Sequence, residues 1–101
     1  MKTKIKTLKA FDPAEYLDDP EAIAAYIEEA FDIGDPKFIA DAIGVVARAV
    51  GMSEIARASG LSRESLYKTL SAEGNPELGT VLRVIGALGL KLSVEPQTPS
   101  M

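Results

Sequence analysis

Residues 52–70 constrain the fold of this chain more than any other part of its sequence. Their apolar positions recur at helical spacing on both sides of Gly60, a residue that adopts a positive φ angle without steric cost. Ala56 stands four residues before this glycine, where a second helix would cross the first and little more than a methyl group fits. The apolar residues placed to fix the angle between the helices are Ile55, Leu61 and Leu66. The segment therefore predicts two short helices joined by a tight turn.

The second of these helices is expected to begin after Ser62, whose hydroxyl can cap the unpaired N–H groups of the first turn. The side chains that would then point outward are Arg63, Glu64, Tyr67 and Lys68. This arrangement is typical of a helix-turn-helix, which inserts its second helix into the major groove of DNA. We expect Arg63 to read bases, because a guanidinium group can donate two hydrogen bonds to guanine. The simpler alternative is a surface arginine, although a cation at a helix start opposes the helix dipole.

The other polar side chains of this segment each allow a structural and a functional interpretation. Glu64 and Lys68 have the i,i+4 order that forms a stabilising salt bridge, whereas Lys68 alone would suit a DNA phosphate. Tyr67 would either contact a sugar or a thymine methyl group, or flank the core. Ser62 and Ser53 are expected to cap helices, with phosphate contacts as an addition. The predicted DNA-binding residues are thus Ser53, Ser62, Arg63, Glu64, Tyr67 and Lys68.

Three Asp-Pro or Asn-Pro pairs precede apolar-periodic stretches and mark the starts of further helices: Asp19-Pro20, Asp35-Pro36 and Asn75-Pro76. In each pair the polar side chain can cap the helix, and the proline lacks only an N–H group that the first turn leaves unpaired. The predicted helices run over Pro20–Phe31, Pro36–Val50 and Pro76–Leu88. We expect the inward faces to contain Ile23, Ile27 and Phe31 in the first helix, and Leu78, Val81, Leu82, Ile85 and Leu88 in the last.

The hydrophobic period changes from helical to alternating near the end of the chain. Residues Leu90–Glu95 alternate apolar and polar side chains, which predicts a strand. A strand needs a partner, and the candidates are the same strand of a second copy, residues Lys4–Lys9 or a sheet edge in another protein. The fold class is therefore all-α, with a helix-turn-helix, an extra N-terminal helix and one short C-terminal strand. We expect a single domain over 19–95, an extended arm over 1–18 and a disordered tail over 96–101.

Charge is distributed unevenly along the chain. The net charge of the 101 residues is −4, and residues 1–50 account for it with ten acidic and six basic side chains. Residues 51–101 carry five of each, and the segment 52–70 has three basic residues against two acidic ones. A DNA-binding segment beside an acidic half indicates a second, basic partner. The residues expected to bind that partner are Asp18, Asp19, Glu21, Glu28, Glu29 and Asp32. The alternative is that these residues are helix caps and solvated helix faces.

Composition excludes several classes of protein. The chain has no cysteine and no histidine, so disulfides, the usual zinc ligands and the Ser-His-Asp and Cys-His catalytic arrangements are ruled out. We therefore expect a protein that is not an enzyme and needs no cofactor or metal. No apolar run is long enough to span a membrane, and no apolar signal region follows Met1, so the expected location is the cytoplasm.

The chain also resembles a known family. Similarity to Xre/Cro-type helix-turn-helix domains lies in the frame from Ala56 and Gly60 through Asn75-Pro76 to Ala87–Leu90, with the matching phrases Gly51–Arg57, Gly60–Lys68 and Gly74–Pro76. The likeness covers residues 7–94, and its upstream part includes Phe11-Asp12, Tyr16-Leu17, Ile23–Tyr26 and Gly34–Pro36. With these upstream residues, the chain more narrowly resembles the probable addiction-module antidote proteins, the antitoxins of chromosomal toxin–antitoxin pairs.

The resemblance implies a homodimer that binds operator DNA, represses its own operon and neutralises a small toxin. Such toxins are typically of the RelE/ParE superfamily and often ribosome-dependent mRNA endonucleases. Met52 departs from the pattern, since many Xre domains carry at this position a glutamine that contacts the DNA backbone. Two alternatives remain open: a stand-alone regulator of the prophage type without a toxin, and a protein-interaction module that no longer binds DNA.

Overall fold

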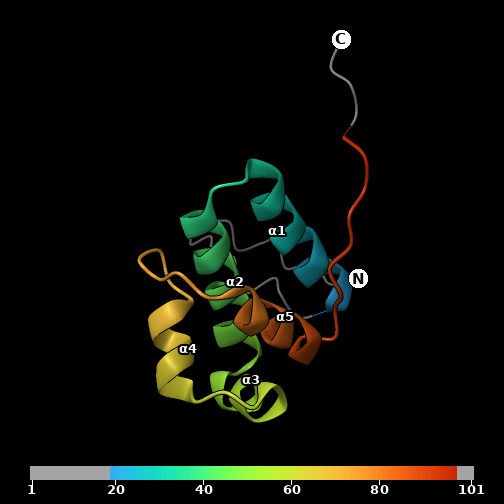
Figure 1. The fold of residues 1–101 in the computed structure, drawn as a ribbon. Helices are drawn as coiled ribbons and strands as arrows, with labels where there is room; N and C mark the ends of the chain where they lie inside the picture. The colour runs from blue at the N-terminus through green and yellow to red at the C-terminus, as the bar shows by residue number, and fades with distance from the viewer. Residues whose placement is uncertain (1–18, 98–101) are drawn as a thin grey trace, which may run out of the picture.

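The computed structural model describes residues 19–97, and residues 1–18 and 98–101 lie outside this part of the chain. Within residues 19–97 the protein is all-α (Figure 1). The five helices of this range are α1 (Pro20–Ile33), α2 (Pro36–Val50), α3 (Met52–Ser59), α4 (Arg63–Thr69) and α5 (Leu78–Ala87). None of these five is long and apolar enough to cross a membrane.

Aspartate-proline pairs start the first two helices, as predicted. The Ala22 N–H donates to Asp19 Oδ1 at 2.7 Å, and the Lys37 N–H donates to Asp35 Oδ1 at 3.1 Å. In both helices the proline stands in the first turn. Gly34 ends α1 with a φ angle of 81°, which reverses the chain into α2. The bounds of α2 are those predicted, and α1 continues past its predicted end by two residues.

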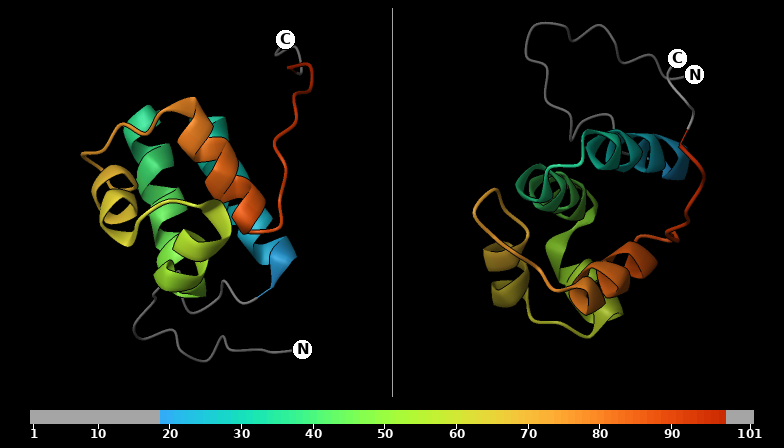
Figure 2. Two further views of the ribbon diagram at one scale, coloured as in Figure 1. Left: turned by 60° about the horizontal axis from the view of Figure 1, so that its bottom comes forward. Right: turned by 45° about the horizontal axis from the view of Figure 1, so that its top comes forward.

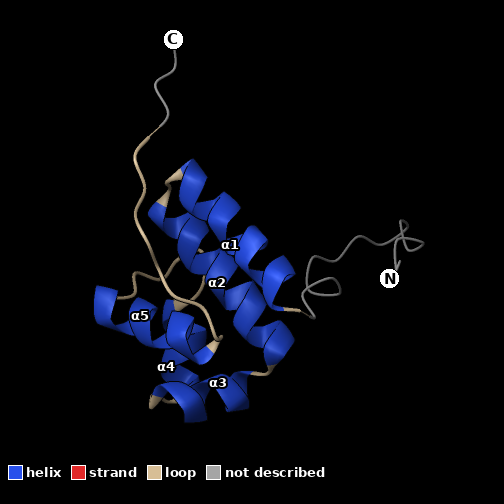
Figure 3. Ribbon diagram, turned by 90° about the vertical axis from the view of Figure 1, so that its right-hand side faces the viewer, coloured by secondary structure: helices blue, strands red, loops and turns tan. Residues whose placement is uncertain are grey.

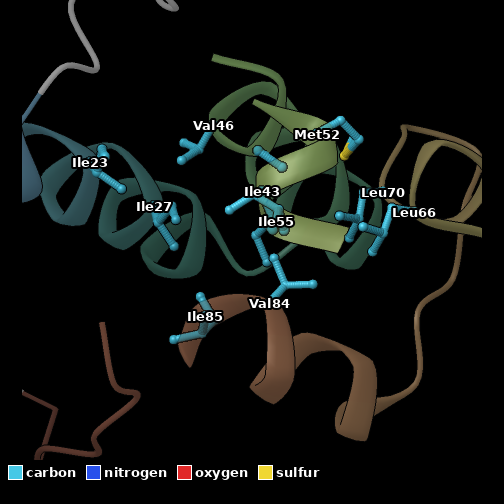
Figure 4. Packing of buried hydrophobic residues seen from close by; sticks show 11 residues of the cluster. Ile23, Ile27, Ile43, Val46, Met52, Ile55, Leu66, Leu70, Val84 and Ile85 are labelled. Atoms are coloured by element: carbon cyan, nitrogen blue, oxygen red, sulfur yellow. The ribbon is translucent and has the colours of Figure 1, made fainter. Parts of the chain in front are cut away.

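The helices enclose one core, to which every helix contributes (Figure 4). α1 packs along α2, α3 contacts α2, α4 and α5, and α4 also contacts α2. The largest fully buried side chains are Ile43, Val46, Ile55, Leu66, Leu70 and Val84. Burying such a side chain contributes about 1.5–3 kcal/mol relative to leaving it exposed. The predicted wedge of Ile55, Leu61 and Leu66 is part of this packing, so the core holds α3 and α4 at a set angle.

Close approach between α2 and the end of α4 depends on a glycine. A Cβ atom added to Gly44 would overlap the backbone carbonyl of Leu70. Gly74 is similarly tight against the backbone of Thr69 and shapes the loop that follows α4. Neither contact was predicted, because a glycine inside an apolar-periodic run does not reveal which backbone lies opposite it.

The predicted start of α5 is wrong. The helix begins at Leu78 and its N-cap is Glu77, which makes no side-chain capping hydrogen bond. Asn75 and Pro76 therefore belong to the preceding loop, although they have the composition of a helix start. The loop has to connect the end of α4 to the start of α5, and Asn75 and Pro76 form the last part of that connection.

Two predicted inward faces also need correction. Leu78 and Leu82 are exposed, whereas Ile85 is buried as predicted, and the fully buried Val84 was not predicted. Most residues of α5 are themselves apolar or glycine and are spread around the helix. The hydrophobic period alone therefore does not show which face of α5 packs against the core. Phe31, expected beside Ile23 and Ile27, is exposed in the last turn of α1, where the buried residue is Ala30 instead.

The strand predicted over Leu90–Glu95 is not formed, and none of residues 19–97 lies in a strand (Figure 3). The segment continues from α5 as irregular chain, with Val94 almost fully exposed. A strand requires a ladder partner, and the described part of this single chain supplies none. The pairing candidate Lys4–Lys9, the arm predicted over 1–18 and residues 98–101 of the predicted tail lie outside the described residues.

Candidate functional site

Hydrogen bonds to one carbonyl group hold the turn between α3 and α4. The Gly60 and Leu61 N–H groups donate to the Ala56 carbonyl oxygen at 3.0 and 3.2 Å. Ser59 is buried; its hydroxyl donates to the same oxygen at 3.3 Å and accepts from the Leu61 N–H at 3.3 Å. Gly60 has a φ angle of 78°, as its place in the turn predicts. The part played by Ser59 was not predicted, because it depends on burial of the hydroxyl in the folded turn.

α4 is anchored on one face and open on the other. Leu66 and, just after the helix, Leu70 are fully buried. The Ser65 N–H donates to Ser62 Oγ at 3.1 Å, which confirms the predicted cap. The residues predicted to point outward are all exposed, namely Arg63, Glu64, Tyr67 and Lys68. The packing therefore fixes the helix and turns a polar face of mixed charge toward solvent.

Arg63 and Tyr67 contact each other one turn apart on this face. The Arg63 guanidinium carbon lies 5.7 Å from the centre of the Tyr67 ring, within the range of a cation–π interaction. At an exposed site such a contact contributes about 0.5–1 kcal/mol. Tyr67 is 44% exposed, so it lies on the surface rather than in the core. The ring thus limits the orientations open to the guanidinium group and keeps it close to α4.

The salt bridge considered for Glu64 and Lys68 is not formed. Within residues 19–97 the one salt bridge joins Arg57 and Glu54 of α3 at 2.8 Å. Both of its side chains are well exposed, so it contributes no more than about 1 kcal/mol. Glu64 and Lys68 therefore keep their charged groups in solvent, where a ligand can reach them.

The start of α3 differs from the prediction that Ser53 caps this helix. Ser53 lies inside the helix, whose N-cap is Gly51 and has no side-chain hydrogen bond, so the predicted cap at Ser53 is wrong. Met52 is buried in the core. Met52 therefore contributes to the packing of α3 and not to the exposed surface.

Four of the six predicted acidic residues lie in α1, which is across α2 from α4 (Figure 1, Figure 2). The exposed ones are Glu21, Glu28, Glu29 and Asp32. Asp19 caps α1, so the structural interpretation applies to it, and Asp18 lies outside the described residues. None of the four exposed residues has a basic partner within residues 19–97. The residues predicted to bind partners thus form two separate groups, one on α3 and α4 and one on α1.

Known proteins share the sequence that builds this architecture. Residues 7–96 match the sequence profile of a family described as probable addiction module antidote protein. An uncharacterized protein of Haemophilus influenzae is 47% identical over 88 residues, which cover 87% of this chain and 91% of that protein. No solved structure matches the chain. Because the profile match spans α1 to α5 and most of the residues before α1, the chain belongs to the family of probable addiction module antidote proteins.

Proposed function

We propose that this protein is the antitoxin of a type II toxin–antitoxin pair. It neutralises a small basic toxin of the RelE/ParE type by direct binding, and it represses its own operon as a DNA-binding homodimer in the cytoplasm. Both roles rest on binding and need no catalysis or cofactor. Membership of an antidote family supports a toxin partner of some kind. The DNA-binding part is supported by the exposed face of α4, which carries Arg63 and Tyr67 on a helix whose opposite face is buried.

The outward face of α4 has the size and chemistry that a major-groove reader needs. Its seven residues rise about 10 Å, and the groove is about 12 Å wide. Arg63 would donate to O6 and N7 of a guanine, while Lys68 would contact a phosphate. Because Leu66 and Leu70 anchor the opposite side of the helix, these groups would meet DNA on a preformed surface.

A homodimer would present two copies of α4 to successive turns of the major groove. Half-sites would then be about 34 Å apart and related by two-fold symmetry. α5 supports such a dimer, because Leu78 and Leu82 are exposed and a Cβ atom on Gly79 or Gly86 would meet nothing within 4 Å. An apolar helix face with such small residues allows close approach of a second helix.

Growth rescue tests the toxin part of the proposal. The chain and the product of any small reading frame found beside its gene are placed under separate inducible promoters. The adjoining gene alone should arrest growth, and the chain should restore it and copurify with the product through a high-salt wash. Arrest without rescue, or no arrest at all, would favour the stand-alone regulator.

Operator binding by Arg63→Ala tests the DNA part. The loss of one guanine contact should weaken binding to the chain's own promoter fragment by about 1–3 kcal/mol, roughly 5–150-fold. Fluorescence anisotropy at several salt concentrations measures this, and wild-type affinity should fall steeply with salt. Arg48→Ala is the matched control, because it removes an exposed arginine from α2. Unchanged operator binding by Arg63→Ala would refute α4 as the reader.

A further inference from the structure

Both phenylalanines of the described residues are exposed, and they lie at the same corner of the fold. Phe31 is 37% exposed near the end of α1, and Phe38 is 45% exposed in the first turn of α2. Ile33, between them in the chain, is 63% exposed. Phenylalanine and isoleucine are among the residues most often buried in proteins. Exposed apolar side chains gathered at one corner are a feature that partner proteins often cover.

Packing between α1 and α2 does not need these large side chains. The buried residues nearest the corner are Ala30 in α1 and Ala40 in α2. Larger buried side chains, such as Ile27 and Ile43, lie further from the turn along each helix. Small residues let the two helices approach closely at the corner, so the large apolar residues there remain outside the core.

Acidic side chains accompany the exposed apolar ones. Residues 28–38 include four acidic residues, Glu28, Glu29, Asp32 and Asp35, and one basic residue, Lys37. All of them are exposed, and the salt bridge within the described residues involves none of them. Glu28 is three residues from Phe31 and therefore beside it on the helix surface. Apolar side chains with a charged rim are characteristic of protein–protein interfaces, and this rim would attract a basic partner.

The corner is remote from the DNA-reading end of the molecule. Figure 1 and Figure 3 both show the α1–α2 turn at the top, and α3 with the start of α4 at the bottom. A protein bound at the corner would therefore leave the outward face of α4 accessible.

We propose that the toxin docks at this corner. The docking surface, here named the corner patch, consists of Phe31, Ile33, Phe38, Glu28, Glu29 and Asp32. The proposal rests on the proposed antitoxin function and specifies the partner's chemistry, an apolar depression bordered by lysine and arginine. The toxin covers the apolar side chains, its cations meet the carboxylates, and the antitoxin holds toxin and operator at the same time.

Two single substitutions test the corner patch in the full chain, with the purified product of the adjoining reading frame as the probe. Ile33→Glu and Phe38→Glu each place a charge within the patch at an exposed position, so folding is retained. Val50→Glu is the matched control, because Val50 is 41% exposed at the other end of α2. Isothermal titration should show a loss of toxin affinity of roughly 30-fold or more for each patch variant. The control should bind the toxin as wild type does, and all melting temperatures should stay unchanged.

The acidic rim is tested by reversing its charge. Glu28→Lys combined with Glu29→Lys should slow toxin association on the order of tenfold at low salt, because the rim would repel a basic partner. Glu73→Lys, in the loop after α4, is the control and should leave the association rate near that of wild type. Equal rates for both changes would contradict the part assigned to the carboxylates.

Other outcomes separate this proposal from the function on which it rests. Wild-type toxin affinity in both patch variants, with the wild-type chain still neutralising the toxin, would overturn the corner patch alone. Failure of the wild-type chain to bind any toxin would overturn both. Patch variants that lose self-association in sedimentation, and not toxin affinity, would show that a second copy covers the corner. Displacement of operator DNA by the toxin would contradict simultaneous binding.

Discussion

The α1–α2 region and the α3–α4 region are alike on their inner faces and differ on their outer ones. Both supply aliphatic side chains to one core. Residues 19–50 carry seven acidic and two basic side chains, whereas residues 51–70 carry two acidic and three basic ones. Net charge bears on association and not on which fold forms. The difference therefore reflects what each region is proposed to contact, namely a basic protein in one case and DNA in the other.

The α1–α2 turn and the α3–α4 turn also differ in how they are held together and in what they expose. The turn after α3 is tied by a buried hydroxyl and by two N–H groups that share the Ala56 carbonyl, which fixes the angle at which α4 is presented. The turn after α1 is closed by Gly34 and the Asp35 cap, with large apolar side chains exposed around it. A base reader needs fixed geometry, whereas a protein-docking surface needs exposed apolar area.

The largest expected effect lies where the two regions touch. Gly44→Ala should lower the free energy of unfolding by about 3 kcal/mol, because the added methyl group would overlap the Leu70 carbonyl. Gly79→Ala is the control, since it changes a glycine in α5 whose added Cβ atom would meet nothing within 4 Å. That variant should lose no stability as a monomer, because the added methyl group meets no neighbour in the chain. Urea unfolding measures both, and wild-type stability of Gly44→Ala would show that this contact does not join the two regions.

Removing one helix cap from each region allows the two regions to be compared through smaller losses of stability. Ser62→Ala and Asp35→Ala each remove one observed capping hydrogen bond, so each should cost about 1 kcal/mol of stability. Thermal unfolding followed by circular dichroism checks this equality. Operator binding should then separate them, because Ser62 caps the proposed reading helix and Asp35 caps α2. Equal losses of operator affinity would indicate that DNA binding depends on overall stability and not on α4.

The smallest effect is expected at the salt bridge on α3. Glu54→Gln removes the partner of Arg57 from an exposed pair, so the free energy of unfolding should fall by less than about 0.5 kcal/mol. Glu64→Gln removes an exposed carboxylate that has no salt bridge and serves as the control. A loss above 1 kcal/mol for Glu54→Gln alone would mean that the α3 surface contributes to stability as much as a helix cap does.

Sequence reasoning succeeded where the deciding contacts are local. The caps at Asp19, Asp35 and Ser62 and the turn at Gly60 were all predicted, and each depends on groups within one helical turn. It failed at Asn75-Pro76, whose composition is that of a helix start but whose position is in a loop. The outward residues of α4 were predicted because its inner face is defined by only Leu66 and Leu70.

By itself, the sequence determined the number of helices within residues 19–97, most of their ends and the outward face of α4, since these follow from cap chemistry and hydrophobic spacing within each segment. Only the tertiary structure decided that Leu78 and Leu82 lie outside, that Gly44 meets a backbone, and that Phe31 and Phe38 share an exposed corner. Those features depend on contacts between residues far apart in the chain. A one-dimensional pattern can mark a side chain as apolar, but its neighbours in space determine whether it is buried.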